Sequence, residues 1–200
     1  MEWVYFLESG IASVVAHASK GRQIETGIIG HEGFVGSSLL LGDVRCMQNV
    51  VMQVPGTGRR ISVQRFMTLV GQLPDLRQHS LLFLRAFMIQ TAQTAVANGC
   101  AQLSERLARC LVMLNDLVED DVLAITHDYI SVMLSVRRPG VSIALKALEK
   151  ANLIAIKRGL IAIKGRDGLI AKANGLYGAT EREYDRLLHW RPPGGARRHG

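Results

Sequence analysis

The sequence predicts an α+β fold in which an N-terminal β-roll is joined by a long helix to a winged helix-turn-helix domain. Short apolar runs separated by glycine-containing turns fill residues 3–70. An apolar heptad pattern runs through residues 76–97, and two amphipathic segments followed by a basic hairpin occupy residues 126–164. The expected units in chain order are a roll (1–73), a long dimerisation helix (74–98), a winged domain (99–190) and a disordered tail (191–200).

The amino-acid composition is that of a globular protein without a metal site or a membrane span. The 200 residues are 48% hydrophobic and 20% charged, which is typical of a globular protein with a real core. Cysteines 46, 100 and 110 are too widely spaced for a disulfide framework or a CxxC metal pair, so we expect no metal and no cofactor. The sequence shows no apolar run long enough to span a membrane and no secretory signal, which predicts a cytoplasmic protein with no membrane partner.

The N-terminal part has the pattern of a roll or sandwich. Short apolar runs recur at regular spacing and are separated by turns that contain glycine or proline, such as Glu8–Gly10 and Pro55–Gly56. The predicted strands are 4–7, 11–16, 23–29, 47–54 and 59–63. The family resemblance described below implies that some strands of a complete roll are missing before residue 4, or that the start site is misassigned.

A long helix is predicted next, entered at Pro74–Asp75. Its heptad seam is formed by Leu81, Leu84, Met88, Thr91 and Ala95. One side of this helix is expected to pack on the roll while the seam meets a second subunit; the alternative is a single buried helix. Asn98–Gly99 interrupts the pattern and predicts a hinge before a helix over 103–117, whose apolar face is Leu107, Leu111 and Leu114.

Two short helices joined by a tight turn follow. Thr126 is the predicted N-cap of the first, whose apolar positions are Ile130, Met133 and Leu134. After a break at Ser135–Val136, the second helix begins at Arg138–Pro139, because proline is favoured in a first helical turn. Its buried stripe is Val141, Ala144, Leu145 and Leu148. This arrangement predicts a helix-turn-helix, whose second helix can enter the DNA major groove.

A basic hairpin completes the predicted domain. Apolar runs 153–157 and 160–164 flank the two-residue connection Arg158–Gly159, which predicts a wing. From residue 126 to 172, nine Lys or Arg face three acidic residues, so this segment carries +6 of the formal net charge of +7. That charge indicates a nucleic-acid partner, although such three-helix units also serve as protein-interaction modules. The candidate DNA contacts are Thr126, Arg137, Arg138, Pro139, Gly140, Ser142, Lys146, Lys157 and Arg158.

The segment THDYISVMLSVRRPGVSIALKALEKANLI, followed by the basic hairpin, resembles the DNA-binding domain of Crp/Fnr-type transcription regulators. The resemblance extends along nearly the whole chain. It implies a homodimer that binds a palindromic site in double-stranded DNA, with RNA polymerase as a further partner. Two alternatives remain: a ligand-binding or protein-interaction module without DNA binding, and an enzyme using Cys46 or Cys100. The sequence shows no nucleophile motif around either cysteine, so we expect no enzyme.

The same resemblance implies that the roll is a cyclic-nucleotide-binding-like jelly roll. Cyclic-nucleotide members of the family place a glycine–glutamate turn and an Arg–Ser–Ala-like triplet around the ribose and phosphate. Glu32–Gly33 and Arg45–Cys46–Met47 correspond to these, but Cys46 lacks the hydroxyl and Met47 is bulky. We therefore do not expect cyclic nucleotide binding, and the effector stays open. The alternative interpretation is that Glu32 is only a turn residue and Arg45 only a solvent-exposed charge.

The stretch after the wing has a simpler pattern. Arg166–Gly168 is predicted as a turn, 169–174 as a short helical piece and 177–188 as a charged helical tail.

Overall fold

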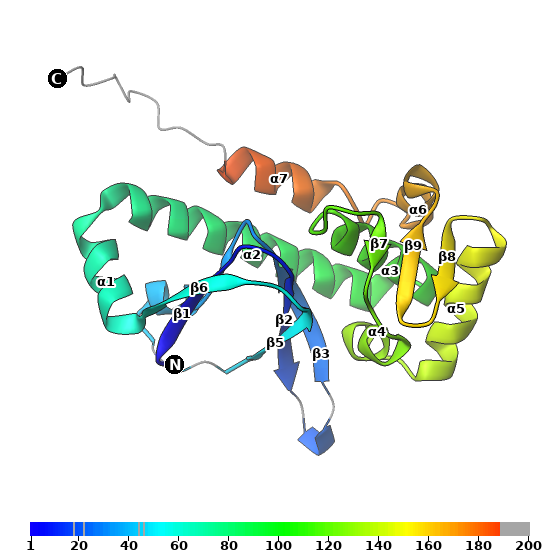
Figure 1. The fold of residues 1–200 in the computed structure, drawn as a ribbon, viewed down its shortest axis with the longest axis horizontal. Coiled ribbons are helices and arrows are strands. Elements are labelled where there is room, and N and C mark those ends of the chain that lie inside the picture. Colours follow the sequence, from blue (N-terminus) through cyan, green and yellow to red (C-terminus); the bar gives the residue numbers. More distant parts are fainter. Residues whose placement is uncertain (18, 22, 44, 46, 189–200) are drawn as a thin grey trace.

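The computed structural model describes residues 1–17, 19–21, 23–43, 45 and 47–188. Its fold is α+β, as the sequence predicts, with a β-roll, a long helix and a C-terminal domain of helices and a small sheet (Figure 1). None of the helices over the described residues combines the length and apolar character needed to cross a membrane.

The roll consists of two antiparallel three-stranded sheets with strand orders β4-β1-β6 and β3-β2-β5. Its strands are β1 (Trp3–Leu7), β2 (Ile11–His17), β3 (Gln23–Ile29), β4 (Phe34–Val35), β5 (Asn49–Val54) and β6 (Gly58–Ser62), with short 3-10 turns η1 (Ser19–Gly21) and η2 (Ser37–Leu41). The five predicted strands are present, and β4 is an additional one. The two sheets enclose an apolar core that includes Val4, Val14, Ile29, Phe34 and Phe66.

Helix α1 (Val63–Gln72) corrects the prediction that β structure continues to residue 70. The Ser62 side chain caps this helix by accepting a hydrogen bond from the Arg65 backbone N–H at 3.3 Å. Phe66 and Val70 are buried one helical turn apart, so the apolar spacing here is helical and not alternating. The roll therefore ends at Ser62.

Helix α2 (Pro74–Cys100) runs beneath the roll and buries Phe83, Leu84 and Phe87. The predicted hinge at Asn98–Gly99 is wrong, because both residues lie inside this helix. The chain breaks at Ala101–Gln102 instead. There Gln102 and Glu105 form a reciprocal capping box that starts the next helix. A glycine in a helix costs about 1 kcal/mol but does not by itself end it.

The C-terminal domain contains α3 (Leu103–Asn115), β7 (Val122–Leu123), α4 (His127–Leu134), α5 (Arg138–Lys150), β8 (Ile154–Lys157), β9 (Leu160–Ile163), α6 (Arg166–Lys172) and α7 (Ala179–Leu188). The predicted face of Leu107, Leu111 and Leu114 on α3 is confirmed, since all three are fully buried. These leucines belong to a core that also includes Ile130 and Leu145 of the two short helices.

Two features of the C-terminal domain differ from the sequence-based expectation. Strand β7 pairs with β9, which turns the predicted hairpin into a sheet of order β7-β9-β8. The predicted turn at residues 166–168 is wrong, because these residues are the first turn of α6. Arg166 anchors that turn to Asn115 and Asp116 of the α3 end through hydrogen bonds of 3.0 and 2.5 Å.

Helix α7 lies along α2 (Figure 1). Its Tyr184 ring meets the Phe83 ring edge-on at a centroid distance of 6.4 Å, and Leu187 is buried. The predicted helical tail is thus a packed element of the fold, while the predicted disordered tail at 191–200 lies outside the described residues.

Candidate nucleic-acid interface

The turn between α4 and α5 forms as the sequence predicts. Thr126 Oγ1 accepts a hydrogen bond from the Tyr129 backbone N–H at 3.2 Å and so caps α4. Ser135 ends α4 in the left-handed region at φ 49°, which reverses the chain sharply. Helix α5 then begins at Arg138 with Pro139 in its first turn. The two helices pack through Ile130, Met133 and Leu145, as expected for a helix-turn-helix.

Helix α5 separates its residues cleanly into two faces. Val141, Leu145 and Leu148 are buried as predicted, while Ala144 is half-buried. The opposite face is available to a partner. It presents Arg138, Pro139, Ser142, Ile143 and Lys146, of which only Ser142 is half-buried, and Gly140 lies half-buried beside it.

Two polar contacts hold this face in place. Arg138 Nε lies 3.4 Å from Asp128 Oδ1, and both side chains are well exposed, so water and a competing partner can replace this ion pair. The Ser142 hydroxyl lies 3.0 Å from Nδ1 of His127, which links the start of α4 to the middle of α5. Sequence analysis did not identify His127, because no local pattern pairs positions 15 residues apart.

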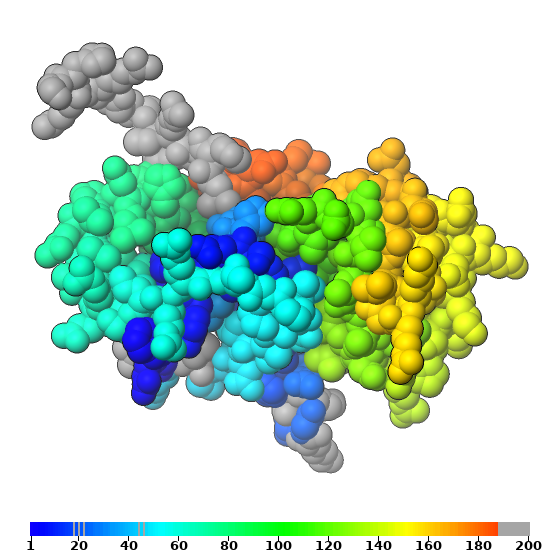
Figure 2. All heavy atoms as spheres, viewed as in Figure 1, coloured from blue at the N-terminus to red at the C-terminus, as the bar shows by residue number. Residues whose placement is uncertain are grey.

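The wing places its basic residues beside the helix-turn-helix. Gly159 adopts φ 73°, which suits the tight β8–β9 connection, and Lys157 and Arg158 project into solvent. Figure 2 shows α5 and this hairpin, in yellow and orange, at the end of the molecule opposite to α1. A groove of about 580 Å³ lies between the wing and the helices. Its lining includes Thr126, Arg138, Lys157 and Arg158, so four predicted site residues meet here, while Arg137 and Lys146 are exposed outside it.

A buried polar junction fixes α4 against the roll. The Glu25 carboxylate of β3 accepts hydrogen bonds from the Ser13 hydroxyl and, at 3.1 Å, from the Tyr129 hydroxyl of α4. Burial raises the pKa of Glu25 from 4.5 to about 7, against the opposing effect of these hydrogen bonds and of Arg109.

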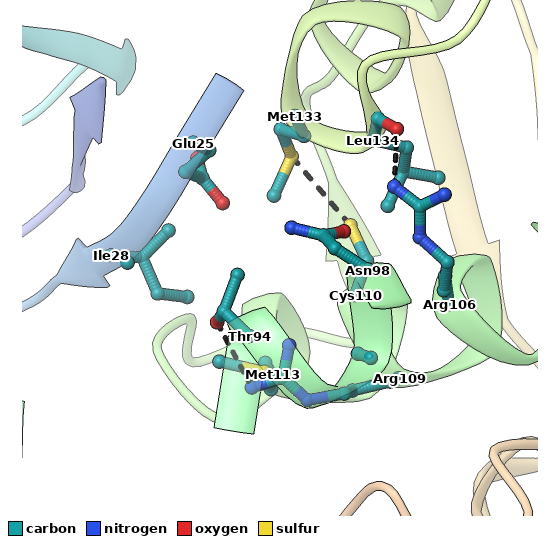
Figure 3. Close-up of a pocket in the computed structure, with 12 residues that line it drawn as sticks. Glu25, Ile28, Thr94, Asn98, Arg106, Arg109, Cys110, Met113, Met133 and Leu134 are labelled. Carbon is teal, nitrogen blue, oxygen red and sulfur yellow. Dashed lines mark hydrogen bonds between the residues drawn. The ribbon is translucent and has the colours of Figure 1, made fainter. Parts of the chain in front are cut away.

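The side chains around Glu25 come from three further elements (Figure 3). Arg109 of α3 donates to Thr94 of α2 at 3.3 Å, and the Cys110 thiol of α3 lies 3.6 Å from the Met133 sulfur of α4. Burial raises the pKa of the Cys110 thiol, which therefore stays protonated. Sequence analysis did not predict this junction.

The structure does not assemble the predicted effector-binding set. Glu32 Oε1 accepts from the Gly30 backbone N–H at 3.0 Å within its turn. Gly33 makes room for the Phe83 ring, since a Cβ there would lie 2.2 Å from it. Arg45 is 84% exposed and pairs with Asp43, so it is not directed at Glu32. Cys46 lies outside the described residues. Across those residues no cluster of three or more His, Cys, Asp or Glu could hold a metal ion.

The predicted seam on α2 is partly exposed. Leu81 and Met88 are 39% and 60% exposed, and Ala95 is exposed beside them. Thr91 is half-buried and its hydroxyl bonds to the Phe87 carbonyl. Leu84 does not belong to this stripe, because it is buried within its own chain. Because α2 is apolar on two sides, the heptad pattern alone does not tell which apolar residues pack inside the chain and which remain exposed.

Residues 105–172 match the family model of the Crp-like helix-turn-helix domain. The chain therefore contains a Crp-like helix-turn-helix domain. A comparison with curated proteins gives no significant match.

Solved structures of Crp/Fnr-family regulators share the fold of this chain along most of its length. TTHB099, a CRP-family transcriptional regulator from Thermus thermophilus, superposes with a TM-score of 0.68 at 19% identity, covering 87% of this chain and 89% of its own. TTHA1359 from the same organism gives 0.64 at 18% identity, with 86% and 88% covered. The c-di-GMP responsive regulator CLP of Xanthomonas campestris gives 0.64 at 19% identity, with 82% and 85% covered. At these identities the likeness concerns the fold alone.

Proposed function

We propose that this chain is a Crp/Fnr-type transcription regulator that binds a palindromic DNA site as a homodimer, with α5 of each subunit in a major groove. Support comes from one observation: the exposed face of α5 and the basic wing border the same groove, so that Arg138, Lys157 and Arg158 are presented together. In a dimer, the two recognition helices would meet successive major grooves about one helical turn apart.

Within this interface we assign base recognition mainly to Arg138. It stands in the first turn of α5, and residues there reach base edges in helix-turn-helix proteins. Its ion-pair partner Asp128 is exposed and can be replaced by DNA. A bidentate contact from arginine to guanine contributes about 1–3 kcal/mol of discrimination. Ser142 assists from the next turn, held by His127.

The other residues of the interface position the DNA. Arg137, Lys146, Lys157 and Arg158 are exposed cations that would contact phosphates. Thr126 orients the start of α4 at the groove, and Pro139 and Gly140 keep the first turn of α5 free of bulky polar groups.

Selection of bound duplexes from a random pool with the purified chain tests the proposal. Enrichment of a palindrome is expected. Arg138→Ala should then flatten the preference at one base pair per half-site, whereas Arg158→Ala should weaken all duplexes alike and reduce the salt slope. Equal loss on specific and scrambled sites in Arg138→Ala would contradict base recognition by Arg138. Absence of any salt-dependent binding would favour the alternative, a ligand-binding or protein-interaction module.

We further propose that the exposed stripe Leu81, Met88 and Ala95 of α2 forms the dimer contact. Met88→Asp would bury a charge opposite its own copy in an apolar interface, which is costly without a partner. Sedimentation should show monomers and operator binding should be lost. Met67→Asp, on the exposed face of α1, is the matched control and should stay dimeric. If Met88→Asp also stays dimeric at micromolar concentration, the stripe is not the interface. RNA polymerase is the proposed partner in transcription.

A further inference from the structure

A second cavity, separate from the DNA-facing groove, lies between the roll, α2, α3 and α7. Its volume is about 530 Å³, within the range of small-molecule sites. Its wall is formed by β3 and the turn after it, by α2, by α3 and the segment after it, and by α7 and the segment before it. Its lining includes Glu32, Met113, Leu117, Tyr177 and Tyr184.

Two side-chain oxygens on this cavity are buried without a hydrogen-bond partner. Glu32 uses Oε1 to accept from the Gly30 N–H, which leaves Oε2 buried and unpaired. The Tyr184 hydroxyl, contributed by α7, is likewise buried and unpaired. Buried polar groups in folded proteins normally have a hydrogen-bond partner, so each of these needs an explanation. Burial and the negative charge of Glu32 raise the pKa of Tyr184, which keeps its proton available for donation.

The electrostatics of the lining favour a cation. Four carboxylates border the cavity, and none of the lining residues in the described chain is Lys or Arg. Asp116 already binds Arg166, and Glu181 accepts from the Gly178 N–H at 2.7 Å, but Glu32 retains an unpaired oxygen. The Arg166 guanidinium already lies 5.6 Å from the centroid of the Tyr177 ring, so Tyr184 is the ring that can attract a further positive charge. An anion would be repelled by the negative charge of these carboxylates.

We propose that this cavity binds a small organic cation, an amine that also carries a hydrogen-bond acceptor. Its N–H would donate to Glu32 Oε2, its acceptor would receive the Tyr184 hydroxyl proton, and its hydrocarbon part would pack on Met113 and Leu117. The site differs from the cyclic-nucleotide set considered in the sequence, because it excludes Arg45 and selects the opposite charge. It does not depend on the proposed DNA function.

Three probes of equal chain length test the proposal on the full chain: 4-aminobutan-1-ol, butane-1,4-diol and 4-hydroxybutanoate. Amide chemical shifts would be followed by NMR up to tens of millimolar probe. The amine should give saturable shifts at residues lining the cavity, with a Kd at least tenfold below that of the diol, and the carboxylate should give none. Equal binding of the carboxylate, or no saturable shifts with the amine, would overturn the proposal.

Isosteric variants then assign the contacts. Glu32→Gln should raise the Kd of the amine at least tenfold and Tyr184→Phe about threefold or more, while the exposed controls Glu119→Gln and Tyr5→Phe should leave it unchanged. An unchanged Kd in Glu32→Gln would place the amine elsewhere and refute the site. Arg138→Ala should bind the amine normally, which separates this result from any failure of DNA recognition. If a variant folds poorly, the comparison of the three probes on the unmodified chain still tests the proposal.

Discussion

Glu25 should make the stability of this protein depend on pH. Its carboxyl is buried between the roll and α4, and its pKa is raised from 4.5 to about 7 in the folded chain. Between pH 4.5 and about 7, the Glu25 carboxyl is therefore protonated in the folded state and ionised in the unfolded state. Stability contributed by this group is fully present below about pH 4.5 and is lost as the pH rises through about 7. The whole shift corresponds to about 3 kcal/mol, because each pKa unit is 1.36 kcal/mol.

Glu25→Gln isolates this effect. The amide is neutral at all pH values, and its oxygen can accept from both Ser13 and Tyr129, since both hydroxyls bond to the same carboxylate oxygen. Urea unfolding followed by circular dichroism at pH 5, 6, 7 and 8 would give the free energy of unfolding for each protein. Between pH 5 and 8, the unmodified chain should lose about 2–3 kcal/mol more than Glu25→Gln.

The comparison with the variant matters because other ionisable groups of the chain also contribute to the pH dependence of stability. Their contributions are shared by both proteins and cancel in the difference. Glu119→Gln, which removes an exposed carboxylate, should follow the pH dependence of the unmodified chain. If Glu25→Gln and the unmodified chain show the same slope, Glu25 is ionised in the folded state at pH 5 and the reasoning fails.

Two further predictions concern ligands and operator. Calorimetric titration with cyclic AMP and cyclic GMP should show no heat at micromolar ligand, since Arg45 is exposed and paired with Asp43; saturable binding would show that another segment supplies the contacts. Ile143 is 71% exposed on the partner-facing side of α5 and should contact a thymine methyl group. Replacing thymine by uracil at one operator position should weaken the unmodified chain several-fold but leave Ile143→Ala unaffected; a uniform loss in both would exclude this contact.

Local signals explain which elements the sequence predicts well. Thr126, Pro139 and the stripe Val141, Leu145 and Leu148 act within one or two helical turns, so their spacing alone locates α4 and α5. The errors arise where two local signals compete. Gly99 indicates a helix end, but the capping box at Gln102 determines it three residues later.

Long-range contacts lie beyond what such patterns can show. The Tyr129 hydroxyl and Glu25 are 104 residues apart, and nothing in either neighbourhood marks them as partners. Tyr184 and Glu32 likewise become neighbours on one cavity only because α7 folds back onto α2. The proposed DNA-binding face could be outlined from sequence because its charge and its helical period define it. The cavity could not, because its walls come from four separate elements.

The junction at Glu25 also constrains how the recognition helix can move. Helix α4 is held to β3 by the Tyr129–Glu25 hydrogen bond, and α5 is held to α4 by the tight turn at Ser135 and by the His127–Ser142 contact. Figure 1 shows α4 placed between the roll and α5. Because α4 and α5 share one core, they should move as a single body. The Tyr129–Glu25 pair, together with the apolar contacts of Ile11 and Ile28, therefore holds α4 and α5 to the roll. A rotation of α5 relative to α2 must break these contacts or carry β3 with it.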